Sequence, residues 1–231
     1  MNHTSRKFLK AIPVILILLT AFACPAFSED IQTLIRNAEG GDPKAQFNLG
    51  VAYERGQVVP QDYAESMKWY RMAAEQGLAE AQNNVGIAYE KGQGVPKDDA
   101  KSMKWFHMAA EQGLADAQYN LGVAYYNGQG VSKDSAESMK WFRMAAEQGH
   151  AGAQCILGIS YSDGHVVPQD YLLAYFWTSL ASKSYKCGGD NSRANYFYMD
   201  YAANAARQLT PDQLTKAKQM IQEWEEKHPT K

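Results

Sequence analysis

Small and apolar residues recur along most of the chain at spacings of three and four, the period of a helix that buries one face. Between residues 81 and 89, for example, Ala81, Val85 and Tyr89 form one such stripe. Gly92 follows as a residue expected to close the helix in a left-handed conformation. Asp98 then offers an N-cap for a second helix. The pattern therefore predicts two helices within residues 77–112.

The second of these helices is expected to turn one side toward its neighbours, and Gly113 ends it. The packing side is predicted to hold Ala100, Met103, Trp105, Met108 and Ala109. His107 occupies the position of Arg71 and Arg143 in the neighbouring segments, which indicates a solvated face.

The pattern itself repeats with a period of 36 residues. Four tryptophans keep this spacing: Trp69, Trp105, Trp141 and Trp177. Two glycine positions keep it as well, namely Gly41, Gly77, Gly113 and Gly149 at one and Gly50, Gly86, Gly122 and Gly158 at the other. Residues 77–112 and 113–148 are identical at 26 of 36 positions, which excludes a chance register. We therefore predict four units, 41–76, 77–112, 113–148 and 149–184.

Each unit is too short to bury its apolar face alone, so neighbouring units must stack. The glycines of the series that begins with Gly50 are expected to let two helices approach closely, with the tryptophans filling the space between units. The predicted fold is all-α, a right-handed α-solenoid of antiparallel helix pairs. A second linker glycine, Gly94 or Gly130, is replaced by Val58 and Val166 in the outer units, so a positive φ is not obligatory there.

The ends of such an array need polar caps. Residues 29–40 are expected to form an N-terminal capping helix, and residues 185–231 to form C-terminal capping helices, the first over Ser192 to Arg207. The last helix has a clear start, because Thr210, Pro211 and Gln213 fit a capping box with proline at the first position. Its apolar stripe is expected to cover the fourth unit, and comprises Leu214, Ala217, Ile221 and Trp224.

The first 28 residues fit a secretory signal peptide. A basic start with Arg6, Lys7 and Lys10 precedes an apolar run over residues 11–23, which at about 20 Å of helix is shorter than the bilayer core. Cleavage after Ala23 or after Ser28 fits, and a retained anchor is the alternative. We expect an exported protein, periplasmic or secreted.

The short motifs of the units resemble a known family. Ala-x-x-x-Leu-Gly-x-x-Tyr, Gly-x-Gly-Val-x-x-Asp and Trp-Phe-x-x-Ala-Ala-Glu-Gln-Gly, as they stand in residues 77–148, are similar to the Sel-one-like (Sel1-like) repeat, a branch of the tetratricopeptide superfamily. This resemblance implies a helical scaffold for protein–protein interaction, generally without catalysis of its own. Cys24 stands where a lipoprotein carries its acyl chains, although Ala21 and Phe22 depart from that motif, and a membrane partner is expected only if Cys24 is lipidated.

Composition and side-chain chemistry narrow the function further. The content of 45% apolar and 21% charged residues is that of a globular protein, and the net charge of −2 argues against a nucleic-acid partner. The five histidines lack metal-ligand spacing, no cofactor is expected, and no nucleophile, base and orienting group can be assembled. We therefore expect a non-catalytic protein. The alternative is a cell-envelope hydrolase, or a binder of β-lactams or peptidoglycan fragments, since some cysteine-rich relatives are associated with β-lactam binding.

Two of the three cysteines lie beyond the first 28 residues. Cys155 and Cys187 would be joined by a disulfide in an oxidising compartment, tying the fourth unit to the terminal loop. The alternative is two unpaired thiols, because a sequence does not provide the Cα separation that a bridge needs.

Positions that vary between otherwise conserved units point to a binding face. On the first helix of each unit they are expected to share one exposed face, the concave groove of a tetratricopeptide-like solenoid. The candidate groove residues are Phe47, Asn48, Asn83, Asn84, Glu90, Lys91, Tyr119, Asn120, Tyr126 and Asn127. Asn48, Asn84 and Asn120 form a ladder whose amides would bond the backbone of a bound peptide or protein segment. Alternatively, these amides are solvated or bond the adjacent helix end.

Overall fold

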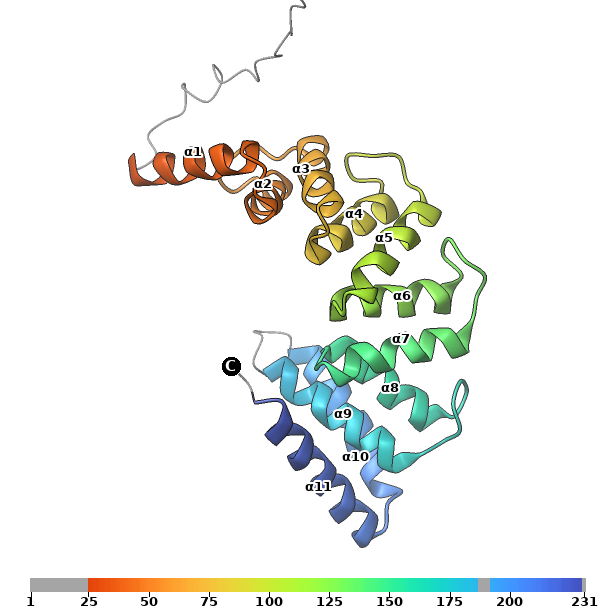
Figure 1. The fold of residues 1–231 in the computed structure, drawn as a ribbon. Coiled ribbons are helices and arrows are strands. Elements are labelled where there is room, and N and C mark those ends of the chain that lie inside the picture. The colour runs from red at the N-terminus through yellow and green to blue at the C-terminus, as the bar shows by residue number, and fades with distance from the viewer. Residues whose placement is uncertain (1–24, 187–191, 230–231) are drawn as a thin grey trace, which may run out of the picture.

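The computed structural model describes residues 25–186 and 192–229, and every regular element in these ranges is a helix. The helices follow one another in a single curved row that opens to one side (Figure 1). Their bounds are α1 Pro25–Glu39, α2 Pro43–Arg55, α3 Tyr63–Glu75, α4 Ala79–Lys91, α5 Asp99–Glu111, α6 Ala115–Asn127, α7 Ser135–Glu147, α8 Ala151–Asp163, α9 Tyr171–Lys186, α10 Ser192–Arg207 and α11 Pro211–Lys227.

Four helix pairs make up most of the row: α2 with α3, α4 with α5, α6 with α7 and α8 with α9. Each second helix also packs against the first helix of the next pair. The predicted all-α solenoid of repeated pairs is confirmed. Within the described ranges, no helix is both long and apolar enough to cross a bilayer.

Local signals in the sequence set the helix ends as expected. Gly92 closes α4 at φ 68°, and the Asp98 carboxylate accepts a hydrogen bond from the Lys101 N–H at 2.9 Å. The predicted capping box is also present, because Thr210 and Gln213 exchange side-chain-to-backbone hydrogen bonds. The short sequence pattern therefore determines where these helices begin and end.

Three tryptophans lie at the three joints between successive pairs, and the fourth lies where the first pair meets α1. Trp69 packs with Leu49 beside α1 and α2, and Trp141 packs with Phe106 between α5 and α6. Trp177 lies in the core between the third and fourth pairs. Trp105 packs against the same kind of cluster between α3 and α4 but is only half-buried. The tryptophan series thus joins the units, as its spacing predicts.

The repeated glycine allows the two helices of a pair to approach closely. A Cβ added at Gly86 would lie 2.6 Å from the Phe106 ring, well inside contact distance. At the linker position, Gly94 has a φ of 70° and lies against the backbone of Tyr63 in the preceding pair. No residue other than glycine has a positive φ in the described ranges, so the valines at this linker position adopt an ordinary conformation.

A glutamine network that sequence reasoning missed links the pairs. Gln82 is buried in α4, donates to the Ala74 carbonyl at the end of α3, and accepts from Gln112 at 2.7 Å. The same pair of bonds recurs one unit before and one unit after. In the fourth unit, Gln154 Oε1 has no partner among the described residues, and Ser184 replaces the second glutamine. The sequence feature that could have revealed this network is a glutamine that recurs unchanged at the position of Gln82 in every unit.

The prediction for the packing side of α5 is wrong at two positions. Met103 and Ala109 are buried, but Met108 is 45% exposed and Ala100 is exposed as well. The side of the helix that contacts α4 and α6 is turned relative to the expected one, and its buried residues are Ser102, Met103, Phe106, Ala109 and Ala110. His107, expected on a solvated face, is half-buried.

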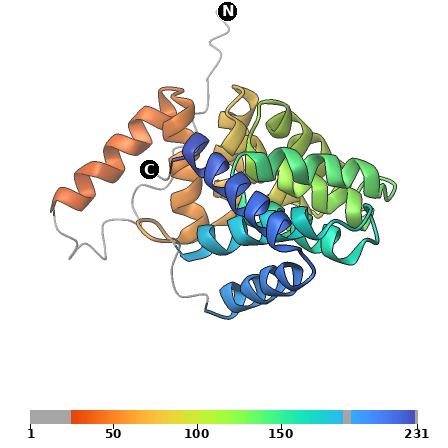
Figure 2. The same cartoon turned by 90° about the horizontal axis from the view of Figure 1, so that it is seen from below.

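Helices outside the four pairs cover both ends of the row. Ile31, Leu34 and Ile35 of α1 pack against the cluster that holds Leu49. At the other end α11 packs against α9, as its apolar stripe predicts, with Ile221 buried. Figure 2 views the molecule from this end, with α10 and α11 in front.

Several predictions concern residues outside the described ranges. These residues include most of the leader, Cys24 and Cys187. Lipidation of Cys24 and the disulfide between Cys155 and Cys187 therefore stay predictions. The second cleavage position, after Ser28, lies within α1, and Cys155 is buried in α8.

Candidate protein-binding groove

The candidate groove residues come from the first helices of three successive pairs, α2, α4 and α6. Asn48, Lys91, Tyr126 and Asn127 are exposed, and Phe47, Asn84, Glu90, Tyr119 and Asn120 are half-buried. Asn83 is only 6% exposed, so the expectation that it lies on an open face is wrong. The inward turn of Asn83 follows from its contact with the next unit.

The asparagine ladder is not made of three equivalent amides. Asn120 Nδ2 donates to Asn83 Oδ1 at 2.9 Å, which joins α6 to α4. One amide hydrogen of the ladder is therefore used inside the protein. Asn84 instead lies beside a small cavity, and Asn48 is exposed on α2. Sequence spacing placed the three residues on one side of their helices but did not reveal these different surroundings.

The cavity lies between α2, α3 and α4 and has a volume of about 30 Å³. Its lining combines polar and apolar side chains: Glu54, Tyr63, Ser66, Met67, Tyr70, Asn84, Ile87, Ala88 and Gln93. The Tyr70 hydroxyl donates to Glu54 Oε2 at 2.5 Å. Burial, with the Glu54 carboxylate acting in the same direction, raises the pKa of Tyr70, so the phenol keeps its proton at neutral pH.

A second polar cluster joins the third and fourth pairs. The rings of Tyr119 and His150 stack at 4.4 Å, and His150 Nε2 lies 3.5 Å from a carboxylate oxygen of Asp116. His150 Nδ1 accepts the Ala153 N–H at 3.1 Å and so caps α8. Burial lowers the pKa of His150, against the opposing effect of Asp116. The neutral ring is the form that can cap, because only an unprotonated nitrogen accepts a hydrogen bond.

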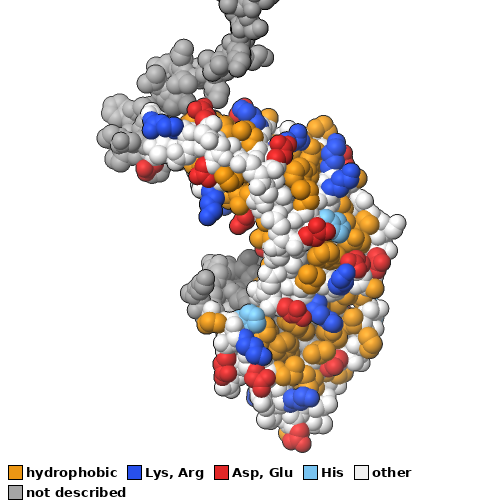
Figure 3. All heavy atoms as spheres, in the orientation of Figure 1, with side chains coloured by type: hydrophobic (Ala, Val, Ile, Leu, Met, Phe, Trp, Pro, Cys, Tyr) orange, Lys and Arg blue, Asp and Glu red, His pale blue; other side chains and the backbone are white. Residues whose placement is uncertain are grey.

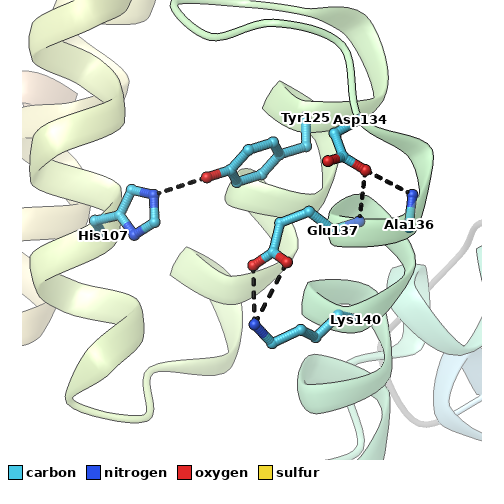
Figure 4. Close-up of polar contacts among 6 residues, drawn as sticks. All are labelled: His107, Tyr125, Asp134, Ala136, Glu137 and Lys140. Atoms are coloured by element: carbon cyan, nitrogen blue, oxygen red, sulfur yellow. Dashed lines mark hydrogen bonds and ion pairs between the residues drawn. The ribbon is translucent and has the colours of Figure 1, made fainter.

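The second helices carry another repeated contact (Figure 4). His107 of α5 lies 3.3 Å from the Tyr125 hydroxyl of α6, where Arg71 and Arg143 donate to the hydroxyls of the next first helices. Asp134 caps α7, and Lys140 pairs with Glu137 on that helix. The His107–Tyr125 contact and its two arginine equivalents hold neighbouring pairs together, whereas the bonds of Asp134 and Lys140 stabilise α7 itself.

Exposed apolar side chains lie on the second helices as well. Met72, Met108 and Met144 are exposed at equivalent positions of α3, α5 and α7. Apolar side chains, mixed with charged ones, extend along the face seen in Figure 3. Among the described residues, no group of three or more histidine, cysteine, aspartate or glutamate side chains is arranged to hold a metal ion.

Solved structures of similar sequence exist. A protective antigen of uropathogenic Escherichia coli that displays an SLR fold is 38% identical over 75% of this chain, with a TM-score of 0.63. The match spans only 40% of that antigen's length. A Sel1 repeat protein of Oxalobacter formigenes is 28% identical over 78% of this chain and 82% of its own, also with a TM-score of 0.63. No curated protein matches the sequence.

The family comparison assigns the repeat unit directly. The Sel1 repeat model matches residues 43–78, 79–114, 115–150 and 151–184, two residues later in phase than the units read from the tryptophan and glycine spacing. These matches span all four helix pairs of the row. The chain belongs to the Sel1 repeat family, whose helical scaffolds typically mediate protein–protein interaction and are generally non-catalytic.

Proposed function

We propose that this chain is a non-catalytic scaffold that holds a peptide or protein partner against the face formed by α2, α4 and α6. The observation that carries the proposal is the distribution of differences between the units. The packing residues of the first helices repeat almost unchanged, whereas an exposed position on them reads Arg55, Lys91, Asn127 and Asp163 along the row. Stacking of the units requires only that their packing residues repeat. Variation at exposed positions of the groove is what recognition of one particular partner would require.

The chemistry of this face suits a polypeptide. Exposed Asn48 offers both an amide donor and a carbonyl acceptor, and Tyr126 offers a ring that is 47% exposed. Aromatic rings with nearby amides are typical of protein interfaces, because the rings bury area and the amides bond backbone groups. We propose export to the periplasm or the exterior on the basis of the leader sequence alone.

A comparison of two exposed faces tests the groove. The partner would be identified by crosslinking in the native cell and its affinity measured with purified protein. We expect Asn48→Ala with Tyr126→Ala to weaken binding at least about tenfold, since both side chains are on the proposed face. The matched control is Met72→Ala with Met108→Ala, on the second helices, which should leave affinity unchanged.

Two results would contradict the proposal. If the methionine variant lost the partner while the groove variant kept it, the binding face would be that of the second helices. Turnover of a cell-wall or β-lactam substrate, abolished by one side-chain substitution, would instead establish the enzyme that we do not expect.

A further inference from the structure

The small cavity between α2, α3 and α4 differs in chemistry from the rest of the proposed groove. Glu54 and Asn84 contribute to it from successive first helices, on the face where the groove residues lie. Glu54, Asn84 and Gln93 are half-buried, while Ser66, Met67 and Tyr70 form its buried part. A group that enters from the groove would therefore first contact polar side chains and then a buried part that combines polar and apolar side chains.

The polar atoms of the lining favour a cation. Tyr70 gives its hydroxyl proton to Glu54, and the Asn84 and Ser66 side chains lie against its oxygen, so the Glu54 carboxylate is the main acceptor left for a ligand. The Asn84 and Gln93 side chains each add a carbonyl oxygen. Lys and Arg side chains are absent from the lining. One negative charge with neutral acceptors around it suits a positively charged donor, since hydrogen bonds between ions of opposite charge are the stronger kind.

The cavity is small. Its volume of about 30 Å³ is enough to hold at least one water-sized group. A primary ammonium group is compact and similar to water in size, whereas a planar guanidinium is larger. Met67, Ile87 and Ala88 supply apolar surface against which a methylene stem can pack.

The combination of groups occurs in one unit of the row. Tyr70 stands where the next two units have Phe106 and Phe142, and Glu54 is followed by Glu90 and then Tyr126 at the equivalent position. At these two positions of the repeat, a carboxylate and a phenol occur together only in the first of the four pairs. The hydroxyl of Tyr70 is not needed for packing, because phenylalanine fills the same place in the second and third units.

We propose that this cavity receives the ammonium group of a lysine side chain of the partner. The inference rests on the proposed function, because it places one anchor of the bound segment at the joint between the first and second units. It adds a chemical requirement on that segment: a lysine that reaches the α2–α4 joint.

The direct test uses N-acetyl-lysine methylamide as probe and the side-chain amide NMR signals of Asn84 and Gln93 as readout. We expect these two signals to shift with the lysine derivative and to stay in place with the norleucine derivative, which has the same stem without the charge. Glu54→Gln keeps the size and the acceptor for Tyr70 but removes the charge, and should weaken binding about tenfold. Glu75→Gln, at an exposed carboxylate of α3 outside the cavity lining, is the matched control and should change affinity less than about twofold.

A second variant, Tyr70→Phe, keeps the inference testable if Glu54→Gln does not fold. Tyr70→Phe installs the residue that the second and third units carry, and is expected to weaken binding of the lysine derivative by about threefold through loss of the bond that orients Glu54. Equal shifts with both derivatives would overturn the inference. So would binding that neither Glu54→Gln nor Tyr70→Phe alters.

The outcome also separates this inference from the proposed function. If the lysine derivative fails to shift Asn84 and Gln93 while the groove variant of Asn48 and Tyr126 still loses its partner, the cavity inference is wrong and the groove stands. If the derivative binds but Glu54→Gln leaves the affinity of the partner unchanged, the cavity is not an anchor for that partner, and the inference is overturned.

Discussion

At the scale of single residues, the equivalent positions of the repeat show what each side chain contributes. The position before each first helix is occupied by Leu78, Leu114 and His150 in three successive units. The leucines make no side-chain cap, whereas His150 Nδ1 accepts a hydrogen bond from the Ala153 N–H. The contribution of the His150 cap to stability can therefore be judged against the units that have leucine at the same position.

The cap at His150 predicts a stability that depends on pH. Because burial holds the pKa of His150 below its unfolded value of about 6.5, the unfolded chain binds the proton more readily than the folded one. The contribution of the cap is therefore complete above pH 6.5 and is lost as pH falls through the lower folded pKa. We expect His150→Leu to cost about 1 kcal/mol at pH 7.5 and progressively less toward pH 5, measured by urea unfolding at several pH values.

The control for this prediction is His150→Asn, which retains a capping oxygen that does not titrate. The difference in unfolding free energy between wild type and His150→Asn should shrink as pH rises. A difference independent of pH would show that the histidine cap is not the titrating group. Asp116 opposes the effect of burial, so Asp116→Asn should lower the pKa of His150 further.

At the scale of the helices, the sequence predicted the joints well because each depends on residues of a particular size, either very small or very large. Gly86 has no room for a Cβ beside Phe106, and tryptophan supplies the largest apolar side chain for a gap between pairs. The glutamine network could not be predicted in the same way. Gln82 and Gln112 are 30 residues apart, and a polar side chain on a helix is ordinarily assigned to the surface.

The tryptophan joints differ in burial, which predicts an order of stability. Trp141 is 7% exposed, while Trp105 is half-buried, so truncation of Trp141 removes more surface from contact. We expect Trp141→Ala to cost about 3–5 kcal/mol and Trp105→Ala clearly less, by thermal and denaturant unfolding. The Trp141 indole N–H is buried without an acceptor among the described residues, so Trp141→Phe should retain most of the stability. Equal losses at the two positions would contradict the role of burial at the joints.

At the scale of the whole molecule, the fold was predictable from the period, but the binding face was predictable only in outline. The period of 36 residues required stacked pairs whatever the individual contacts were. The groove residues depend instead on what each helix contacts, which leaves Asn48 exposed and its equivalent Asn84 half-buried. The Glu54–Tyr70 cavity needed a third helix, α4, to be placed before its lining could be known.

The last helix, α11, is expected to act as the structural cap at the C-terminal end of the row. Ala217 and Ile221 of α11 are buried against α9, and Lys183 pairs with Glu225 across the same contact. Removing residues 211–231 would expose the apolar surface of α9, and an open solenoid end can stack on another copy. We expect the truncated chain to melt at a lower temperature and to self-associate, measured by circular dichroism and by light scattering after size exclusion. Gln222→Ala, exposed on the same helix, should change neither property, and a truncated chain that keeps the melting temperature and mass distribution of the full chain would show that α11 is not a structural cap.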